Sequence, residues 1–501
     1  MLKLKSITLT TGISLSGWLV CSGFIGLLSV NYLVTEGLLG DGLCYAAISR
    51  NMAAGQGTFW RPFYSTSYWL PYNPEVRAFY EHPPLMFGIQ SYFFRWFGDT
   101  LWTEKIYSIT VLLLTILLIA QLWKLSLPEN SPLRSYAWAP VMIWYSFSIV
   151  HWASLQNLLD STLSLFCLLA ILLVLRGMQQ PYSGRSWLLG TGAVLSIMAA
   201  FLTKGPVSLH VLGFPVLYGV LFSSFRLFRR NVVWVLGLGV GFSLLFILLL
   251  LYEPAQHNLS MYIQQQIWAS VTNKRELTGR FVLIEFLIRD ILLITVVLLG
   301  VYGVGRLLKL YPAKEGSSIR VGVFWVCVGL SVVCPMLISK KQYAHYLLPA
   351  LPYLALGLAN WLFYALLPIV RQFAHWPFYR GSMLTGGFLL WAITLVNANN
   401  RVGDFVEDHR VLLTDIHTIG RTVPRQSLLG VFPDLMIQFP LHPYLQRYYQ
   451  IDMATFKSLP PYAMLAMAAP KGQADSLLSI GYSPISVTLN QFRLYKRASI
   501  K

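Results

Sequence analysis

Residues 232–252 read VVWVLGLGVGFSLLFILLLLY, a run with no charged side chain. A helix needs about 20 predominantly apolar residues to cross a bilayer, so this run predicts a membrane span. The rest of the chain has the same character, because 55% of its 501 residues are hydrophobic and only 12% are charged. We therefore expect a polytopic α-helical membrane protein.

The same length criterion predicts about eleven transmembrane helices along the chain. They lie at about 12–34, 100–123, 135–152, 158–176, 186–203, 206–223, 232–252, 284–305, 321–339, 344–367 and 381–397. The first apolar run follows Lys3 and Lys5 and is longer than a signal-peptide core, so we expect it to remain as an uncleaved span. Lys204-Gly205-Pro206 interrupts the long apolar stretch from 186 to 223.

Basic residues predict the orientation. With the N-terminus in the cytoplasm, every inside loop is basic, as the positive-inside rule requires. These loops hold Lys124, Arg134, Arg176, Arg185, Arg226, Arg229, Arg230, Arg306, Lys309, Lys314, Arg320, Arg371 and Arg380. The net charge of +18 is thus scattered over short loops and not gathered on a soluble domain, so we expect no nucleic-acid partner.

Two regions are expected outside the membrane. The first outer loop, 35–99, contains two short helix patterns, Leu43 to Ala54 and Pro84 to Phe97, which we expect to lie along the membrane interface. From about residue 400 the hydropathy falls, and strand-like runs alternate with helix-like ones. We therefore divide the chain into a transmembrane domain, 1–399, and a small extracytoplasmic α/β domain, 400–501. The strand-like runs are 427–432, 463–468 and 492–496, and the helix-like runs are 412–419 and 474–480.

The five cysteines lie mostly inside apolar segments and lack metal-finger spacing, so we expect neither a disulfide framework nor a zinc fold. Ionisable residues at the outer ends of the spans are more informative, because such groups are costly near the bilayer unless they are paired or face a polar cavity. If the topology is right, they share one outer face and form one site. They are Asp41, Glu81, His82, Asp160, Lys204, Lys274, Arg275, Lys340 and Lys341.

Several of these residues also have a structural interpretation. Asp41 could cap the helix that follows it, and Asp160 could interact with a helix dipole. Lys204 could extend its amine to the interface, and Lys274 and Arg275 could be solvated charges. Lys340 and Lys341 lie on the side that the positive-inside rule disfavours, which suggests an anionic partner such as phosphate.

Four motifs along the chain contain most of these charged residues. They are Asp41-Gly42-Leu43-Cys44-Tyr45-Ala46-Ala47-Ile48-Ser49-Arg50, Glu81-His82-Pro83-Pro84-Leu85, Phe201-Leu202-Thr203-Lys204-Gly205-Pro206 and Lys340-Lys341-Gln342-Tyr343-Ala344-His345-Tyr346-Leu347-Leu348-Pro349. In order and approximate position, the motifs resemble those of the bacterial protein O-mannosyltransferase-like enzymes, a group of GT-C glycosyltransferases that includes the lipid A aminoarabinose transferases. The resemblance covers about residues 10–400.

The resemblance implies an inverting glycosyltransferase in the inner (cytoplasmic) membrane, with its active site on the extracytoplasmic side. It would move a sugar from a polyprenyl-phosphate donor, of the undecaprenyl-phosphate type, to a glycolipid, polysaccharide or protein acceptor. No cofactor is expected to be required, and a divalent metal is left open. The implied catalytic residues are Asp41, Glu81 and Asp160; the donor phosphate would contact Lys204, Arg275, Lys274, Lys340 and Lys341; and His82, Tyr45, His345 and Tyr346 would line the site.

The chain departs from its relatives at three positions. The common Asp-Glu opening is Asp41-Gly42 here, and the aminoarabinose transferases carry arginine in place of Cys44 and lysine in place of His82. The last two changes remove positive charge that a phosphate acceptor would require. We therefore expect a hydroxyl acceptor, on a sugar or on a protein serine or threonine, with Asp41 as the general base.

Two other functions remain open. A flippase or transporter of lipid-linked sugars would also place cations near a phosphate, but transporters usually contain inverted repeats and broken helices, and the sequence indicates neither. A non-catalytic assembly subunit would be compatible with the altered Asp41-Gly42 opening.

Overall fold

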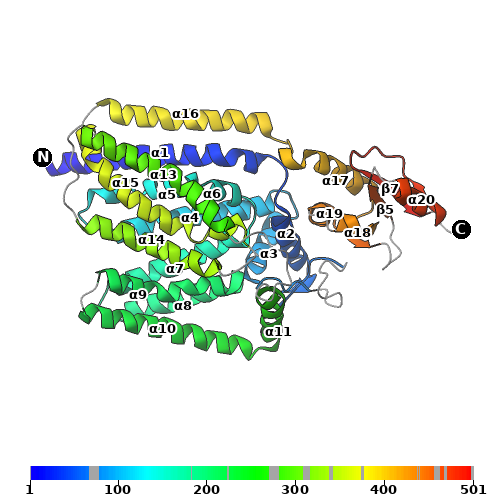
Figure 1. The fold of residues 1–501 in the computed structure, drawn as a ribbon, viewed down its shortest axis with the longest axis horizontal. Helices are drawn as coiled ribbons and strands as arrows, with labels where there is room; N and C mark the ends of the chain where they lie inside the picture. The colour runs from blue at the N-terminus through cyan, green and yellow to red at the C-terminus, as the bar shows by residue number, and fades with distance from the viewer. Residues whose placement is uncertain are drawn as a thin grey trace.

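The computed structural model describes residues 2–66, 78–181, 183–222, 225–269, 281–307, 316–337, 342–373, 377–436, 438, 440–455, 463–467 and 471–497. A bundle of long helices occupies one part of the molecule, and a small domain with a sheet projects from one end of it (Figure 1). The N-terminus lies at the opposite end of the bundle (Figure 1). The expected fold class, a polytopic helical protein with a C-terminal α/β domain, is confirmed.

The helical bundle is built from α-helices and short 3₁₀ helices. Seven apolar stretches among the described residues are long enough to cross a membrane. The elements are α1 (Leu2–Val34), α4 (Thr103–Ser126), η1 (Pro132–Tyr136), α5 (Trp138–Ser146), α6 (Ser148–Ala153), α7 (Leu159–Met178), α8 (Gly184–Lys204), η2 (Gly205–Leu209), α9 (His210–Phe222), α10 (Phe225–Leu250), α13 (Val282–Leu307), α14 (Gly316–Met336), η4 (Ala344–Leu347), α15 (Leu351–Phe373) and α16 (Pro377–Arg401).

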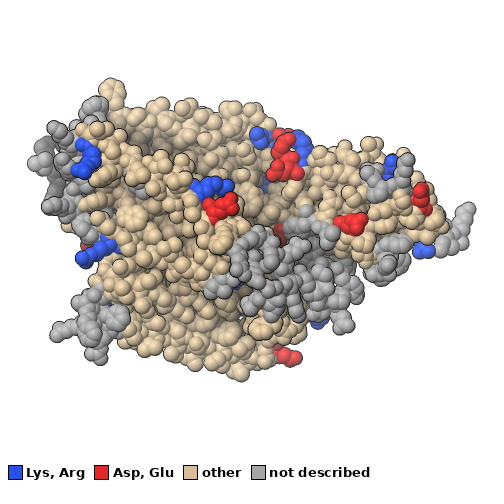
Figure 2. All heavy atoms as spheres, in the orientation of Figure 1, with Lys and Arg blue, Asp and Glu red and all other residues tan. Residues whose placement is uncertain are grey.

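The outer surface of the bundle is apolar. On α10, Leu236, Val240, Leu244, Ile247 and Leu248 each expose more than half of their surface. A stripe of this kind is unfavourable in water but suits contact with lipid. Most of the visible face of the bundle in Figure 2 is tan, interrupted by a group of blue and red side chains near its middle. The exposed side chains therefore agree with the membrane class predicted from composition.

The span expected at 135–152 is not one helix. α5 ends at Ser146, Phe147 adopts extended backbone angles, and α6 begins at Ser148. Asp290 on α13 accepts hydrogen bonds from the backbone N–H of Ser148, at 3.1 Å, and from its hydroxyl, at 2.9 Å. A carboxylate from another helix thus accepts from the backbone N–H that the break leaves without a partner within the helix. The sequence-based expectation that no helix is broken is wrong at this point.

The interruption at Lys204-Gly205-Pro206 is present. Gly205 has a positive φ of 78°, and a Cβ there would lie 2.2 Å from the hydroxyl oxygen of Tyr262. That hydroxyl donates to the carbonyl of Lys204 at 3.1 Å. Glycine is therefore required where α8 ends, both for its backbone angle and for the close approach of Tyr262.

Two helices of the first outer loop, α2 (Gly40–Ala53) and α3 (Leu85–Phe97), occur where the sequence predicted them. α2 does not lie on an interface, however, because 12 of its 14 residues are buried. It packs against α3 and against α19 (Leu441–Tyr449) of the C-terminal domain. The expectation of an interfacial amphipathic helix is wrong for α2, since the C-terminal domain covers the face that would otherwise be exposed.

The C-terminal domain contains a mixed five-stranded sheet in the order β4-β3-β5-β7-β6. β3 is parallel to β4 and β5, whereas β7 is antiparallel to β5 and β6. The three predicted strands and two predicted helices are present, but the short strands β4 and β6 were not predicted. The elements are α17 (Arg410–Thr422), β3 (Leu428–Val431), α18 (Pro433–Met436), α19, β4 (Asp452–Thr455), β5 (Ala463–Met467), α20 (Lys471–Ser479), β6 (Tyr482–Pro484) and β7 (Phe492–Arg497), with η5 (Glu407–His409) before them.

Four further elements follow α2 and α10 in the chain. A two-stranded hairpin, β1 (Gly57–Thr58) and β2 (Arg61–Pro62), follows α2. α11 (Glu253–Tyr262) and the π-helix η3 (Ile263–Trp268) follow α10. In Figure 1, α2, α3 and α11 gather at the end of the bundle nearest the C-terminal domain.

Candidate active site

A cavity of about 920 Å³ lies among α2, the segment before α3, α6, the end of α8, α13 and the segment around η4. Residues far apart in the sequence meet in its wall. Seven residues that the sequence singled out line it: Asp41, Tyr45, Glu81, His82, Lys204, His345 and Tyr346.

Asp41 lies in the first turn of α2. The residue at the N-cap is Leu39, whose backbone N–H donates to Gln156 Oε1 at 2.7 Å. The interpretation of Asp41 as the cap of this helix is therefore wrong. Its position in the first turn still suits a carboxylate, because the N-terminal end of a helix dipole is positive.

Gly42 explains one departure from the related sequences. A Cβ at this position would lie 2.0 Å from the carbonyl oxygen of Gln156. The amide of Asn157 also donates to the carbonyl of Gly42, at 2.8 Å. No side chain fits between α2 and the 156–157 backbone at this separation, so the second carboxylate of the usual Asp-Glu pair is sterically excluded here.

Lys204 and Asp160 form an ion pair behind one wall of the cavity. The Lys204 Nζ lies 2.5 and 2.6 Å from the two carboxylate oxygens. Only 13% of the Lys204 side chain and 3% of the Asp160 side chain are exposed. The amine also lies 4.3 Å from the centroid of the Tyr346 ring, within the range of a cation–π contact. Asp160 thus holds the amine against the cavity. Its place in the first turn of α7 also agrees with the interpretation of a carboxylate at a helix dipole.

Tyr45 lies among the acidic residues of the site. Burial, and then the negative charges of Asp41, Asp160 and Glu81, raise its pKa well above the ordinary value. The phenol therefore keeps its proton at neutral pH and can donate a hydrogen bond. The His82 ring packs edge-on against Tyr45, with ring centroids 5.9 Å apart.

The segment around η4 supplies aromatic side chains. The rings of Tyr343 and His345 stack with centroids 5.5 Å apart, and Tyr346 packs edge-on against His345 at 4.9 Å. Tyr346 in turn contacts the Lys204 amine, so this segment and the end of α8 meet in the cavity wall.

Four predicted phosphate ligands, Lys274, Arg275, Lys340 and Lys341, lie outside the described residues. The described chain reaches the cavity beside both segments, since Gln266, Val282 and Gln342 line it.

Arg289 lines the cavity but was not predicted as a site residue. Its guanidinium donates to the Ser148 hydroxyl at 2.9 Å, and that hydroxyl also contacts Asp290. A signal for it was present, because Arg289 and Asp290 are charged residues within the apolar stretch predicted as the span 284–305. The prediction of site residues did not include Arg289 and Asp290, because both lie far in sequence from the four motifs.

Carboxyl and cationic groups thus share one cavity, with apolar side chains between them. Ile149, Trp152 and Phe286 contribute apolar wall. Among the residues that the structure describes, no group of three or more His, Cys, Asp or Glu side chains could hold a metal ion. The arrangement can hold an anion beside Lys204 and Arg289 and present a carboxylate or a phenol to a second reactant.

Comparisons with known proteins agree with the architecture. The family model for dolichyl-phosphate-mannose-protein mannosyltransferases matches residues 81–251, about a third of the chain. No curated protein matches the sequence. The fold is similar to that of ArnT from Cupriavidus metallidurans bound to undecaprenyl phosphate, with a TM-score of 0.60, 15% identity, and coverage of 99% of this chain and 98% of that one. The apo structure of the same enzyme gives a TM-score of 0.61 and 14% identity, and 100% and 99% of the two chains are covered.

Proposed function

We propose that this chain, which has the fold of the GT-C glycosyltransferases, transfers a sugar from a polyprenyl-phosphate donor to a hydroxyl acceptor. The observation that carries the proposal is the shared cavity, in which Asp41 and Lys204 both line the wall. Glycosyl transfer from a lipid phosphate requires both kinds of group, a base for the acceptor and a cation for the departing phosphate.

The donor phosphate is proposed to bind on the side of Lys204 and Arg289. The Lys204 amine is fixed by Asp160 at 2.5 to 2.6 Å, so it needs no reorganisation when a phosphate arrives. Arg289 has a planar guanidinium that suits two phosphate oxygens at once. Lys274, Arg275, Lys340 and Lys341 are proposed as additional ligands on sequence grounds alone.

The acceptor is proposed to bind on the side of α2. Asp41 would take the proton of the attacking hydroxyl, and attack on the face of the sugar opposite the phosphate would invert the anomeric configuration. Glu81, His82 and the protonated Tyr45 would position the acceptor by hydrogen bonds. Cys44 supplies no positive charge, and His82 stands where the aminoarabinose transferases carry lysine. A glycolipid, a polysaccharide or a protein hydroxyl therefore suits this wall better than a phosphate does.

We place the protein in the inner membrane of the cell envelope, with the cavity and the C-terminal domain on the extracytoplasmic side. The basic loops predicted from the sequence support this orientation. The fold similarity to ArnT, whose crystal structure contains undecaprenyl phosphate, supports a polyprenyl-phosphate ligand.

The decisive experiment is transfer of label from radiolabelled polyprenyl-phosphate sugars by purified protein, with a crude envelope extract as acceptor. The wild type is expected to move label, and Asp41→Ala is expected to lose transfer while keeping expression and donor binding. Wild-type turnover by Asp41→Ala would overturn the assignment of the base.

A flippase or an assembly subunit remains the alternative, because the break between α5 and α6 is a feature that transporters also use. The same assay separates them from a transferase. Donor binding without transfer from any donor would favour the alternatives, and movement of a labelled lipid-linked sugar across vesicles that contain the protein would identify a flippase.

A further inference from the structure

Helix α19 of the C-terminal domain contacts the segment that carries Asp41 at both of its ends. At the first end, the Tyr444 hydroxyl accepts from the backbone N–H of Leu38 at 3.2 Å and lies 3.0 Å from the Leu38 carbonyl. His409 Nδ1 lies 2.9 Å from the same hydroxyl. Leu38 precedes Asp41 by three residues, so Tyr444 fixes the backbone that enters α2.

At the other end of α2, Arg50 reaches back to the same helix. Its Nη1 donates to the carbonyls of Gln446 and Arg447, both at 2.9 Å, and its Nη2 donates to Gln446 Oε1 at 2.6 Å. Carbonyls at the end of a helix are favourable partners for a cation. Arg50 is only 5% exposed, so these bonds form away from water.

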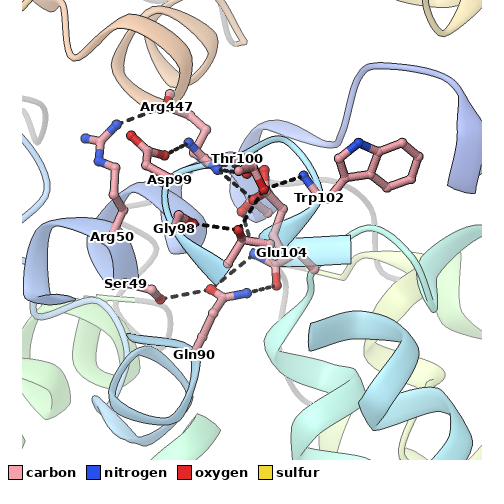
Figure 3. Close-up of polar contacts among 12 residues, drawn as sticks. Ser49, Arg50, Gln90, Gly98, Asp99, Thr100, Trp102, Glu104 and Arg447 are labelled. Atoms are coloured by element: carbon pink, nitrogen blue, oxygen red, sulfur yellow. Dashed lines mark hydrogen bonds and ion pairs between the residues drawn. The ribbon is translucent and has the colours of Figure 1, made fainter. Parts of the chain in front are cut away.

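α19 is in turn anchored to the helical bundle by Arg447. Its guanidinium donates to Asp99 at 2.6 Å, to Glu104 at 2.7 Å and to the Thr100 carbonyl at 2.7 Å. Figure 3 shows these groups around Arg447, with Arg50 beside it. The side chains of Arg447 and Glu104 are 2% and 1% exposed. A buried ion pair of this kind tolerates little displacement, because either charge alone would be left without compensation.

Between these polar contacts, α2 shares a hydrophobic core with the C-terminal domain. Leu38 and Leu43 are buried in one cluster with Leu413, Leu441 and Leu445. Leu43 follows Asp41 by two residues. The same turn also contacts the bundle through Gly42. The first turn of α2 is therefore held between the C-terminal domain and the bundle.

We infer that α19 is a positioning element for Asp41, and that the C-terminal domain acts on the site through this helix. This inference rests on the proposed role of Asp41 as the base. The position of Asp41 relative to Lys204 is set by α19 on one side of α2 and by the bundle on the other. Lys204 and Asp160 belong to the bundle alone, so loosening α19 should impair turnover while leaving donor binding intact.

The test compares Tyr444→Phe, Arg447→Ala and Arg447→Lys in the full-length protein, with Arg493→Ala as the matched control. Arg493 is an exposed arginine on β7 of the same domain. Hydrogen–deuterium exchange over 40–53 reports on α2, and kcat and the donor KM are measured in the transfer assay. Tyr444→Phe keeps the ring and removes only the hydroxyl. We therefore expect it to fold even if Arg447→Ala does not.

Tyr444→Phe should raise exchange over 40–53 by at least about fivefold, the size expected when a single buried hydrogen bond is lost, because the hydroxyl contacts both the N–H and the carbonyl of Leu38. Arg447→Ala should raise it further, and both should lower kcat with an unchanged donor KM. Arg447→Lys should recover part of the loss, since it keeps the charge but not the planar fork. Arg493→Ala should match the wild type in both measurements.

Unchanged exchange over 40–53 in Tyr444→Phe and Arg447→Ala would overturn the inference, as would a rise in donor KM at constant kcat. Failure of this inference and failure of the proposed function are distinguishable. If the wild type transfers no sugar, the proposed function fails, whereas the exchange measurement still reports whether α19 holds α2.

Discussion

Gly42 shows how one residue fixes the geometry of the candidate site. The absence of a side chain lets the first turn of α2 approach the Gln156 carbonyl, and Asp41 comes to the cavity wall as a result. The sequence identified the departure from the Asp-Glu pattern but not its cause. The cause is a contact between positions more than a hundred residues apart, which a local pattern cannot indicate.

Gly42→Ala should therefore lower the melting temperature. The added methyl must displace α2 from the 156–157 backbone, and overpacking of this kind costs about 1–3 kcal/mol. Gly239→Ala is the control, because it adds the same methyl within α10, where nothing beyond the adjoining residues of the helix itself lies within 4 Å of the new Cβ. Equal melting temperatures for Gly42→Ala and the wild type, in thermal unfolding in detergent, would contradict the close approach.

Arg289 belongs to the proposed phosphate side of the cavity. Arg289→Gln should raise the donor KM by about ten- to a hundredfold. It should leave the melting temperature near that of the wild type, because more than half of the Arg289 side chain is exposed. A charge-assisted hydrogen bond to phosphate contributes about 1.5–3 kcal/mol, which sets the scale of the effect. Arg306→Gln, near the other end of α13, should leave the KM unchanged. A wild-type KM in Arg289→Gln would remove Arg289 from the phosphate site.

At the scale of elements, apolar length predicted most of the helices but not where one of them breaks. The hydropathy of 135–152 predicts burial, and most of these residues are buried within the bundle. The break at Phe147 depends on Asp290, which lies far along the chain. The burial of α2 depends likewise on a domain that follows it by several hundred residues. β4 and β6, with four and three residues, are too short to show a periodic pattern.

Asp290→Ala should destabilise the start of α6. The backbone N–H and the hydroxyl of Ser148 would both lose their acceptor, and removal of a helix-capping group costs about 0.5–2 kcal/mol. The expected readout is a lower melting temperature together with faster amide exchange over 148–153. Asp290→Asn keeps an acceptor oxygen and should restore part of the stability. Wild-type exchange over 148–153 in Asp290→Ala would show that the break does not depend on this carboxylate.

At the scale of the whole molecule, the contact between the two domains is predicted to depend on pH. His442 on α19 is buried, with its Nε2 3.4 Å from the Ser65 hydroxyl and Asp452 nearby. Burial lowers its pKa from 6.5 to about 4, although the charge of Asp452 acts in the opposite direction. Burial also lowers the pKa of His409, which contacts Tyr444 of the same helix.

The direction of this pH dependence follows from the number of protons that the folded and unfolded states bind. Between about pH 6.5 and 4 the unfolded chain protonates His442 and the folded protein does not, so the free energy of unfolding falls as the pH falls through this window. The melting temperature should therefore decrease from pH 7 to pH 5, and His442→Gln should reduce the slope. An identical slope in the variant would exclude His442 as a source of the dependence.

The separation of roles within one cavity is tested most directly by steady-state kinetics of Asp41→Asn and Lys204→Gln in the same transfer assay. A base acts on the chemical step, so Asp41→Asn should lower kcat by about 10²–10⁴-fold at a nearly unchanged donor KM. Lys204→Gln should raise the donor KM, because it removes the cation proposed to hold the phosphate. Wild-type kcat in Asp41→Asn, or the same change of KM and kcat in both variants, would contradict the account.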